Sequence, residues 1–151
     1  MTTTAENVSS LQRWYREVWR EANNNIIYEL IAPNAVLKGQ RGSGIVMRGP
    51  EEFAKFAEQI RSAFPDTDLV VEDMFGVGDK VAVRWSATMI HKGEGIGIAP
   101  TNKRVTITGM TIARFVDGKI VEAWDNWDQL AMLEQLGAYA APQGEILEKS
   151  A

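Results

Sequence analysis

The second half of the chain has the composition of a series of β-strands. Residues 68–75, 80–91, 104–115 and 119–127 are rich in valine, isoleucine, threonine and tryptophan, which favour extended structure. Turn signals separate these segments, at residues 76–79 and at the pair Asp117-Gly118. An Asp-Gly pair between two strands is typical of a two-residue hairpin. The segments therefore predict an antiparallel sheet, which constrains the fold more than any other feature of the sequence.

The first half of the chain has helical spacing instead. Ser9 and Gln12 have the spacing of a capping box, and apolar residues recur at helical intervals up to Trp19. Asparagines at positions 23–25 can cap a short second helix, which Pro33 would end. These signals predict two amphipathic helices before the first strand.

The remaining elements are expected between and after these segments. Residues 35–40 read as a short strand and residues 39–49 as a glycine-rich loop. Pro50 stands where a first helical residue belongs, and a third helix would run from there to Pro65. A last helix is expected over residues 128–136, with Gly137 as its stop.

Helices followed by an antiparallel sheet predict an α+β fold in which the helices cover one face of the sheet. A chain of 151 residues with 45% hydrophobic content can build one domain over residues 1–151. Its core is expected at about residues 8–137, with flexible tails at residues 1–7 and 138–151. The pattern fits a filled two-layer sandwich as well as a sheet that curls around a cavity.

Composition argues against several classes of function. The 20 acidic and 16 basic residues are spread along the chain and give a net charge of −4, which does not suit nucleic acid. One histidine and no cysteine cannot form a common zinc or iron site. Glycines 93, 95 and 97 precede a proline and a strand, where a nucleotide loop would need a helix. No run approaches the roughly 18 apolar residues of a membrane span, so a cytoplasmic protein without a nucleic-acid or membrane partner is expected, and without a dinucleotide, zinc or iron site.

A set of short motifs occurs in the order of a known family. Residues 91–103 read HKGEGIGIAPTNK, between two expected strands. They are accompanied by VVED at 70–73, VAVRW at 81–85 and FVDGKIVEAWD at 115–125, and by YREVW and ELIAP near the N-terminus. From about residue 11 to residue 137 the chain thus resembles the SnoaL-like polyketide cyclases of the nuclear-transport-factor-like (NTF2-like) superfamily.

The resemblance implies a cone-shaped α+β barrel whose curved antiparallel sheet wraps around the N-terminal helices and encloses an apolar pocket. It implies a homodimer through the outer face of the sheet. It also implies a cofactor-independent ester cyclase of secondary metabolism, which closes a ring in a small apolar carbonyl or polyketide-like ligand by intramolecular aldol condensation. A related isomerase, a cofactor-free hydroxylase, or a non-catalytic protein that binds a small lipophilic ligand are the alternatives.

In the characterised cyclases an aspartate near the end of the last strand is the acid/base, and the matching residue here is Asp125. The family's histidine fourteen residues earlier is replaced by Thr111. Many relatives have another histidine near the end of the first strand, where this chain has Lys38.

The residues themselves allow Asp125 to act as a base. Alternation along a strand places it on one face with Val121, Ala123 and Trp127, and a carboxylate among apolar neighbours has a raised pKa. Alternatively, Asp125 begins the cap of the last helix or pairs with a surface arginine. Asp128 is the rival carboxylate, but its position suits an N-cap.

Two other polar residues are candidates for catalysis. His91 is the only histidine and, by alternation, shares a face with Trp85 and Met89, so it could replace the missing strand histidine as a proton donor. Alternatively it is a solvated or hydrogen-bonded residue at a strand end. Thr111 could donate to a carbonyl oxygen, or it could be a β-branched residue that serves strand packing.

Aromatic residues supply the candidate binding surface. Tyr15 and Trp14 lie on the apolar face of the first helix, where they could orient a substrate or simply fill the core. A planar ligand could be bracketed by Trp85, Met89, Trp124 and Trp127, although a core needs no ligand to explain them. Arg114 and Glu122 are expected to form a cross-strand ion pair on the outer face.

Overall fold

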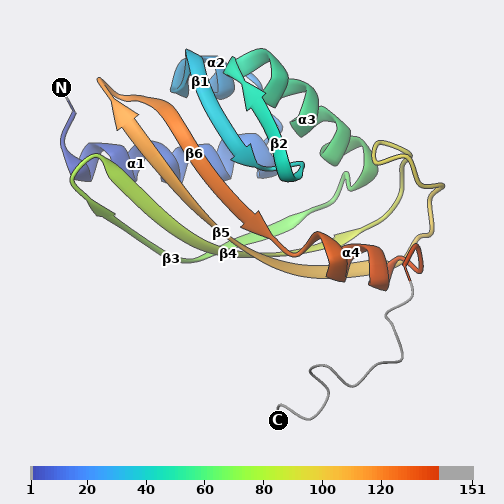
Figure 1. Ribbon diagram of the computed structural model, residues 1–151. Helices are drawn as coiled ribbons and strands as arrows, with labels where there is room; N and C mark the ends of the chain where they lie inside the picture. The colour runs from blue at the N-terminus through green and yellow to red at the C-terminus, as the bar shows by residue number, and fades with distance from the viewer. Residues whose placement is uncertain (1, 140–151) are drawn as a thin grey trace.

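The computed structural model describes residues 2–139, which form a curved sheet packed against helices (Figure 1). In chain order, the elements are α1 (Thr4–Trp14), the π-helix η1 (Tyr15–Arg20), α2 (Asn25–Leu30), β1 (Ile31–Gly39), β2 (Gly42–Arg48), α3 (Gly49–Ala63), β3 (Asp68–Val77), β4 (Lys80–Ile90), β5 (Arg104–Val116), β6 (Lys119–Trp127) and α4 (Gln129–Gln135). None of the helices described is long and apolar enough to span a membrane.

The six strands form one sheet in the order β2-β1-β6-β5-β4-β3. Neighbours pair antiparallel except β1 and β6, which are parallel. The sheet bends strongly without closing, and α1, α2 and α3 lie against it (Figure 1). The predicted α+β architecture and curved sheet are therefore confirmed, with the cone left open between the edge strands β2 and β3.

The strands of the second half lie where their composition predicts them. The hairpin between β5 and β6 turns at Asp117 and Gly118, whose φ angles of 49° and 80° are those of a two-residue turn with two left-handed residues. Arg114 Nε donates to Glu122 Oε1 at 3.2 Å across the same hairpin, which confirms the predicted ion pair.

The prediction of a loop at residues 39–49 is wrong. Gly42–Arg48 is the edge strand β2, which pairs with β1 and supplies the buried Met47 to the core. The residues at 45–47, Ile-Val-Met, favour a strand strongly enough to outweigh the glycines around them. The strand expected at 35–40 is also longer, because β1 begins at Ile31, directly after α2.

The first helix begins earlier than the spacing of Ser9 and Gln12 predicts. Thr3 and Glu6 form the capping box: the Thr3 side chain accepts from the Glu6 backbone, and the Glu6 side chain accepts from the Thr3 backbone. Residues 4–7, expected in a flexible tail, are thus the first turn of α1. The tail expected at the other end lies, from residue 140 onward, outside the described residues.

A π-helix continues α1 where a regular α-helix was expected. In η1 the backbone N–H of Glu21 donates to the carbonyl of Arg16, five residues earlier. Such wide turns are rare and often occur at functional sites. Here the wide turn begins at Tyr15, which is buried.

The segment between β4 and β5 packs on the end of α3. The backbone N–H groups of Lys92 and Gly93 both donate to the carbonyl of Ala63. A side chain at Gly95 would overlap the carbonyl oxygen of Gln59, so only glycine allows this close approach. The glycine motif of residues 91–103 therefore serves helix packing and holds α3 over the sheet.

Candidate functional site: a cavity with one carboxylate

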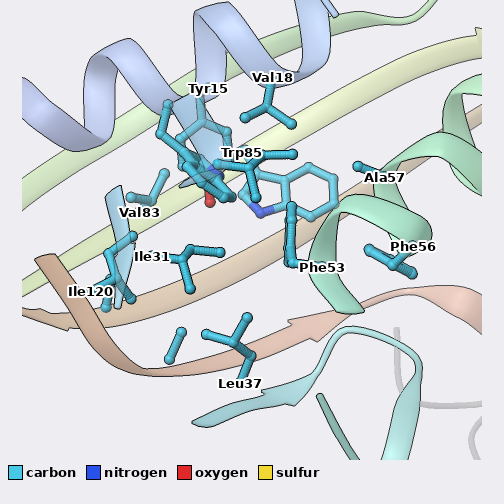
Figure 2. Packing of buried hydrophobic residues seen from close by; sticks show 14 of the residues in the cluster. Tyr15, Val18, Ile31, Leu37, Phe53, Phe56, Ala57, Val83, Trp85 and Ile120 are labelled. Carbon is cyan, nitrogen blue, oxygen red and sulfur yellow. The ribbon is translucent and has the colours of Figure 1, made fainter. Parts of the chain in front are cut away.

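A cavity lies between the helices and the inner face of the sheet, with about 910 Å³ of empty space that includes its opening to solvent. Tyr15, Phe53 and Trp85 line it from η1, α3 and β4, and Figure 2 shows them among the buried side chains between the helices and the sheet. The wall is mostly apolar and aromatic. Its polar side chains among the described residues are Tyr15, Gln40, Thr67, Thr111 and Asp125, together with the indole N–H groups of its tryptophans.

Asp125 lines this cavity from β6, opposite Thr111 on β5. The Thr111 hydroxyl donates to Asp125 Oδ1 at 2.7 Å, and Trp85 Nε1 lies 3.4 Å from the same hydroxyl oxygen. Burial raises the pKa of Asp125 to about 6, although the hydrogen bond from Thr111 lowers it. A carboxyl group with this pKa exchanges protons near neutral pH, as a general acid/base must.

Tyr15 brings a phenol to the same part of the cavity. Burial and the nearby Asp125 carboxylate both raise the pKa of Tyr15 above its usual range, and a hydrogen bond between Tyr15 and Thr111 partly opposes this rise. The phenol therefore keeps its proton at neutral pH and can donate a hydrogen bond. Tyr15, Thr111 and Asp125 thus form a polar cluster in an otherwise apolar wall.

The predicted aromatic residues surround this cluster. Trp14, Trp85, Met89 and Trp127 all line the cavity, and the ring of Trp14 lies 4.9 Å from that of Phe53 on α3. Trp124 does not line the cavity, because it occupies the other face of β6, where Lys38 Nζ lies 5.6 Å from its ring. The prediction that Trp124 contributes to the ligand-binding surface is therefore wrong.

A β-bulge also changes the inner face of β6. Arg114 pairs with Glu122 and Phe115 with Ile120, so Val121 is the extra residue. Ile120 consequently lines the cavity together with Ala123 and Asp125, whereas strict alternation predicts Val121 there.

The structure separates His91 from the other candidates. His91 follows the end of β4, is fully buried, and is not among the residues that line the cavity. Its Nδ1 accepts from the Thr101 backbone N–H at 3.2 Å, and its ring lies 5.3 Å from that of Phe64. These contacts fit the hydrogen-bonded strand end that was the alternative to a proton donor.

Two polar residues of the cavity wall escape the sequence analysis. Thr67 donates to the Phe64 carbonyl at 2.9 Å, so its hydroxyl is already used within the protein. Gln40, in the turn between β1 and β2, is only 4% exposed. Alternation over the predicted strand 35–40 puts Gln40 on the face opposite Leu37, which lines the cavity, so it gives no signal for Gln40. No group of three or more His, Asp or Glu side chains within residues 2–139 is arranged to hold a metal ion.

Comparisons with known proteins agree on one family. The family model of SnoaL-like polyketide cyclases matches residues 9–136. A search of curated proteins finds no match.

Among solved structures, AclR, a proposed hydroxylase from Streptomyces galilaeus, is 29% identical with a TM-score of 0.80, over 93% of this chain and 91% of that one. IdmH, a proposed polyketide cyclase from Streptomyces antibioticus, is 30% identical with a TM-score of 0.72, over 90% of this chain and 99% of that one. A proposed SnoaL-like polyketide cyclase from Jannaschia sp. CCS1 shares the fold, with a TM-score of 0.82 and 23% identity over 93% of this chain and 98% of that one. The chain therefore belongs to the SnoaL-like polyketide cyclase family.

Proposed function

We propose that the protein is a cofactor-independent enzyme that closes a ring in an apolar carbonyl compound, with Asp125 as its acid/base. The observation that carries this proposal is the Asp125 carboxyl group, which faces an aromatic cavity and has a pKa raised to about 6 by burial. Such a group serves proton transfer better than an exposed aspartate, whose carboxylate is a weak base at neutral pH.

The arrangement suits an intramolecular aldol condensation. Asp125 removes a proton from a carbon next to a carbonyl group, and the enolate then attacks a second carbonyl carbon of the same molecule. The new carbon–carbon bond leaves an alkoxide, which takes the proton back from Asp125. Thr111 holds Oδ1, so Oδ2 is left to receive the substrate proton.

Charge develops on the carbonyl oxygen as the proton leaves, and the enolate needs a hydrogen-bond donor there. We assign this role to the Tyr15 phenol, because it stays protonated at neutral pH beside Asp125. Thr111 already donates to Asp125, so in our proposal it positions the base rather than the substrate oxygen.

The binding surface favours a planar, largely apolar substrate. Tryptophans at positions 14, 19, 85 and 127 line the cavity together with Phe53 and Phe56, and aromatic walls bind flat ring systems through stacking and edge contacts. The likeness to IdmH, a proposed polyketide cyclase, agrees with this substrate class.

A hydroxylase is the second candidate, because AclR, a proposed hydroxylase, is similar over most of its length. Hydroxylation could start from the same deprotonation by Asp125. The carbanion would add dioxygen to form a hydroperoxide, and an external two-electron reductant such as a thiol would cleave the O–O bond to leave the alcohol and water. Product analysis separates the two reactions: cyclisation is expected to proceed equally well under nitrogen, whereas a hydroxylated product that forms only in air would support the second candidate.

Proton abstraction can be tested without knowing the natural substrate. The aromatic ketone 1-tetralone exchanges the protons at its C2 carbon in deuterated water, and mass spectrometry or NMR measures the exchange rate. The protein is expected to accelerate this exchange, and Asp125→Asn to reduce the acceleration at least a hundredfold. Asp128→Asn is the matched control, since Asp128 caps α4 by accepting from the Ala131 N–H and asparagine caps equally well. An active Asp125→Asn variant would refute the proposed mechanism.

We further propose that two copies pair through the outer face of the sheet. Cross-strand register places Phe75, Ala82, Ile112 and Trp124 in one row over β3, β4, β5 and β6. Phe75 is 61% exposed and Ile112 is 43% exposed. Met110, which shares the outer face of β5 with Ile112, is 61% exposed. An apolar row of this kind is typical of a surface that is covered in an assembly.

A further inference from the structure

Gln40 is a buried amide that the proposed mechanism does not use. It lines the cavity from the turn between β1 and β2, and its Oε1 is buried without a hydrogen-bond partner among the described residues. Buried polar atoms are nearly always paired, because an unpaired amide in an apolar wall has lost its bonds to water. An exception in a binding cavity points to a ligand that supplies the missing partner.

The backbone of this turn is fixed against the strand that carries Asp125. Gly39 has a φ of +91°, and a side chain at this position would overlap the carbonyl oxygen of Asp125. On the other side, Trp127 Nε1 donates to the backbone carbonyl of Gln40 at 2.8 Å. Asp125 and Trp127 both line the cavity, so these contacts hold the Gln40 amide in the same wall as the carboxylate.

We propose that Gln40 is a substrate-positioning residue, whose amide forms a hydrogen bond with an oxygen atom of the ligand beside Asp125. This inference rests on the proposed function, because it needs a small molecule in the cavity. An amide offers both an N–H donor and a carbonyl acceptor, and rotation about its last bond exchanges the two. It can therefore bind a ketone, an ester carbonyl or a hydroxyl group.

The other polar groups of the cavity limit the ligand further. Thr111 donates to Asp125, and Thr67 donates to the Phe64 carbonyl. The ligand thus meets Asp125 at its reacting carbon, Tyr15 at the carbonyl oxygen next to that carbon, and Gln40 at an oxygen, with aromatic side chains around the rest. We infer a substrate with an apolar ring body and an oxygen substituent that Gln40 uses to fix its orientation.

The test compares 1-tetralone with tetralin, which has the same ring skeleton without the oxygen. Binding of each to the full chain is measured by quenching of tryptophan fluorescence, since four tryptophans line the cavity. The wild type is expected to prefer 1-tetralone. Gln40→Met keeps the length of the side chain and removes its hydrogen-bonding groups, so it should weaken 1-tetralone binding about threefold to tenfold and leave tetralin binding unchanged. Gln12→Met, at an exposed position on α1, is the control and should change neither.

The melting temperature supplies an independent readout. Because Gln40 Oε1 is buried without a partner among residues 2–139, Gln40→Met should melt at or above the temperature of the wild type. A clear drop in melting temperature would show that the amide is paired in the folded protein and would overturn the inference.

The binding results separate this inference from the proposed function. Unchanged preference for 1-tetralone in Gln40→Met would overturn the role of Gln40 and leave the cavity as the site. A wild type that binds neither compound would overturn both proposals.

Discussion

Asp125 stabilises the fold least at the pH where it is most useful as a base. Its pKa is 3.8 in an unfolded chain and about 6 in the folded protein, because burial disfavours the charged form. The folded state therefore binds the proton more tightly than the unfolded chain does. The contribution of this proton to the stability of the folded state is fully present below about pH 4 and is lost as the pH rises through about 6. At neutral pH the protein keeps a buried charge at a cost in stability, as expected of a functional group.

Replacing Asp125 with asparagine should reveal this cost. Asparagine does not ionise and can still accept from Thr111, so the variant should exceed the wild type in free energy of unfolding by up to about 3 kcal/mol at pH 8. At pH 4 the two proteins should differ little. Urea unfolding at both pH values measures the difference, and a variant that is less stable than the wild type at pH 8 would contradict the burial of the charge.

Sequence patterns place most of the cavity residues correctly. Helical spacing puts Trp14 and Tyr15 on the inner face of the first helix, and strand alternation puts Trp85, Thr111 and Asp125 on the inner face of the sheet. The helical period of about 3.6 residues and the strand period of two are properties of the backbone, so they can be applied without knowledge of the tertiary fold.

Alternation does not decide which buried residues reach the cavity near the ends of strands. His91 lies one residue beyond the end of β4, where the chain turns to cover α3, and its ring is held by Thr101 outside the cavity. Gln40 ends the strand predicted at residues 35–40 but lies in the turn after β1, so the period of two does not apply to it. Gln40 owes its position to contacts with β6, far along the chain, and His91 owes its position to contacts with Thr101 and Phe64.

At the scale of elements, the loop between β4 and β5 acts as a clamp on α3. Its glycines approach the helix so closely that a methyl group at Gly95 would meet the carbonyl of Gln59. Gly95→Ala should therefore destabilise the protein by about 1–3 kcal/mol. Glu94→Ala, at the exposed neighbouring position, should have little effect. Thermal unfolding compares the two, and equal stability would show that the loop does not clamp the helix.

The observed boundaries of helices and strands agree well with the predicted ones in the second half of the chain and poorly in the first half. The bounds of β6 are those predicted, since the Asp117-Gly118 turn and strand-forming residues agree. The edge strand β2 and the π-helix η1 were not predicted. Their signals are weak locally, because β2 depends on pairing with β1 and η1 depends on packing against the sheet.

The curvature of the whole molecule decides whether a cavity exists. Register shifts interrupt the pairing of β1 with β2, β3 with β4, and β5 with β6, and bulges of this kind bend a sheet. Periodicity does not record where such bulges fall. The sequence pattern therefore left a filled sandwich and a hollow cone equally open, and only the resemblance to the family favoured the cone.

The proposed dimer belongs to the same scale. Ile112→Glu would place a charge in the middle of the apolar row on the outer face, so it should convert a dimer into a monomer. Leu130→Glu adds the same charge at an exposed apolar position on α4 and should leave the dimer intact. Light scattering coupled to size-exclusion chromatography measures both masses. A wild type that is already monomeric would refute the proposed pairing.

The pH dependence of deuterium exchange into 1-tetralone tests the central claim most directly. If Asp125 is the base, the catalysed rate should rise with pH through a midpoint near 6, the pKa that burial gives this carboxyl group. The rise should be absent in Asp125→Asn. A midpoint near 4, as for an exposed aspartate, or an unchanged profile in the variant would contradict the account.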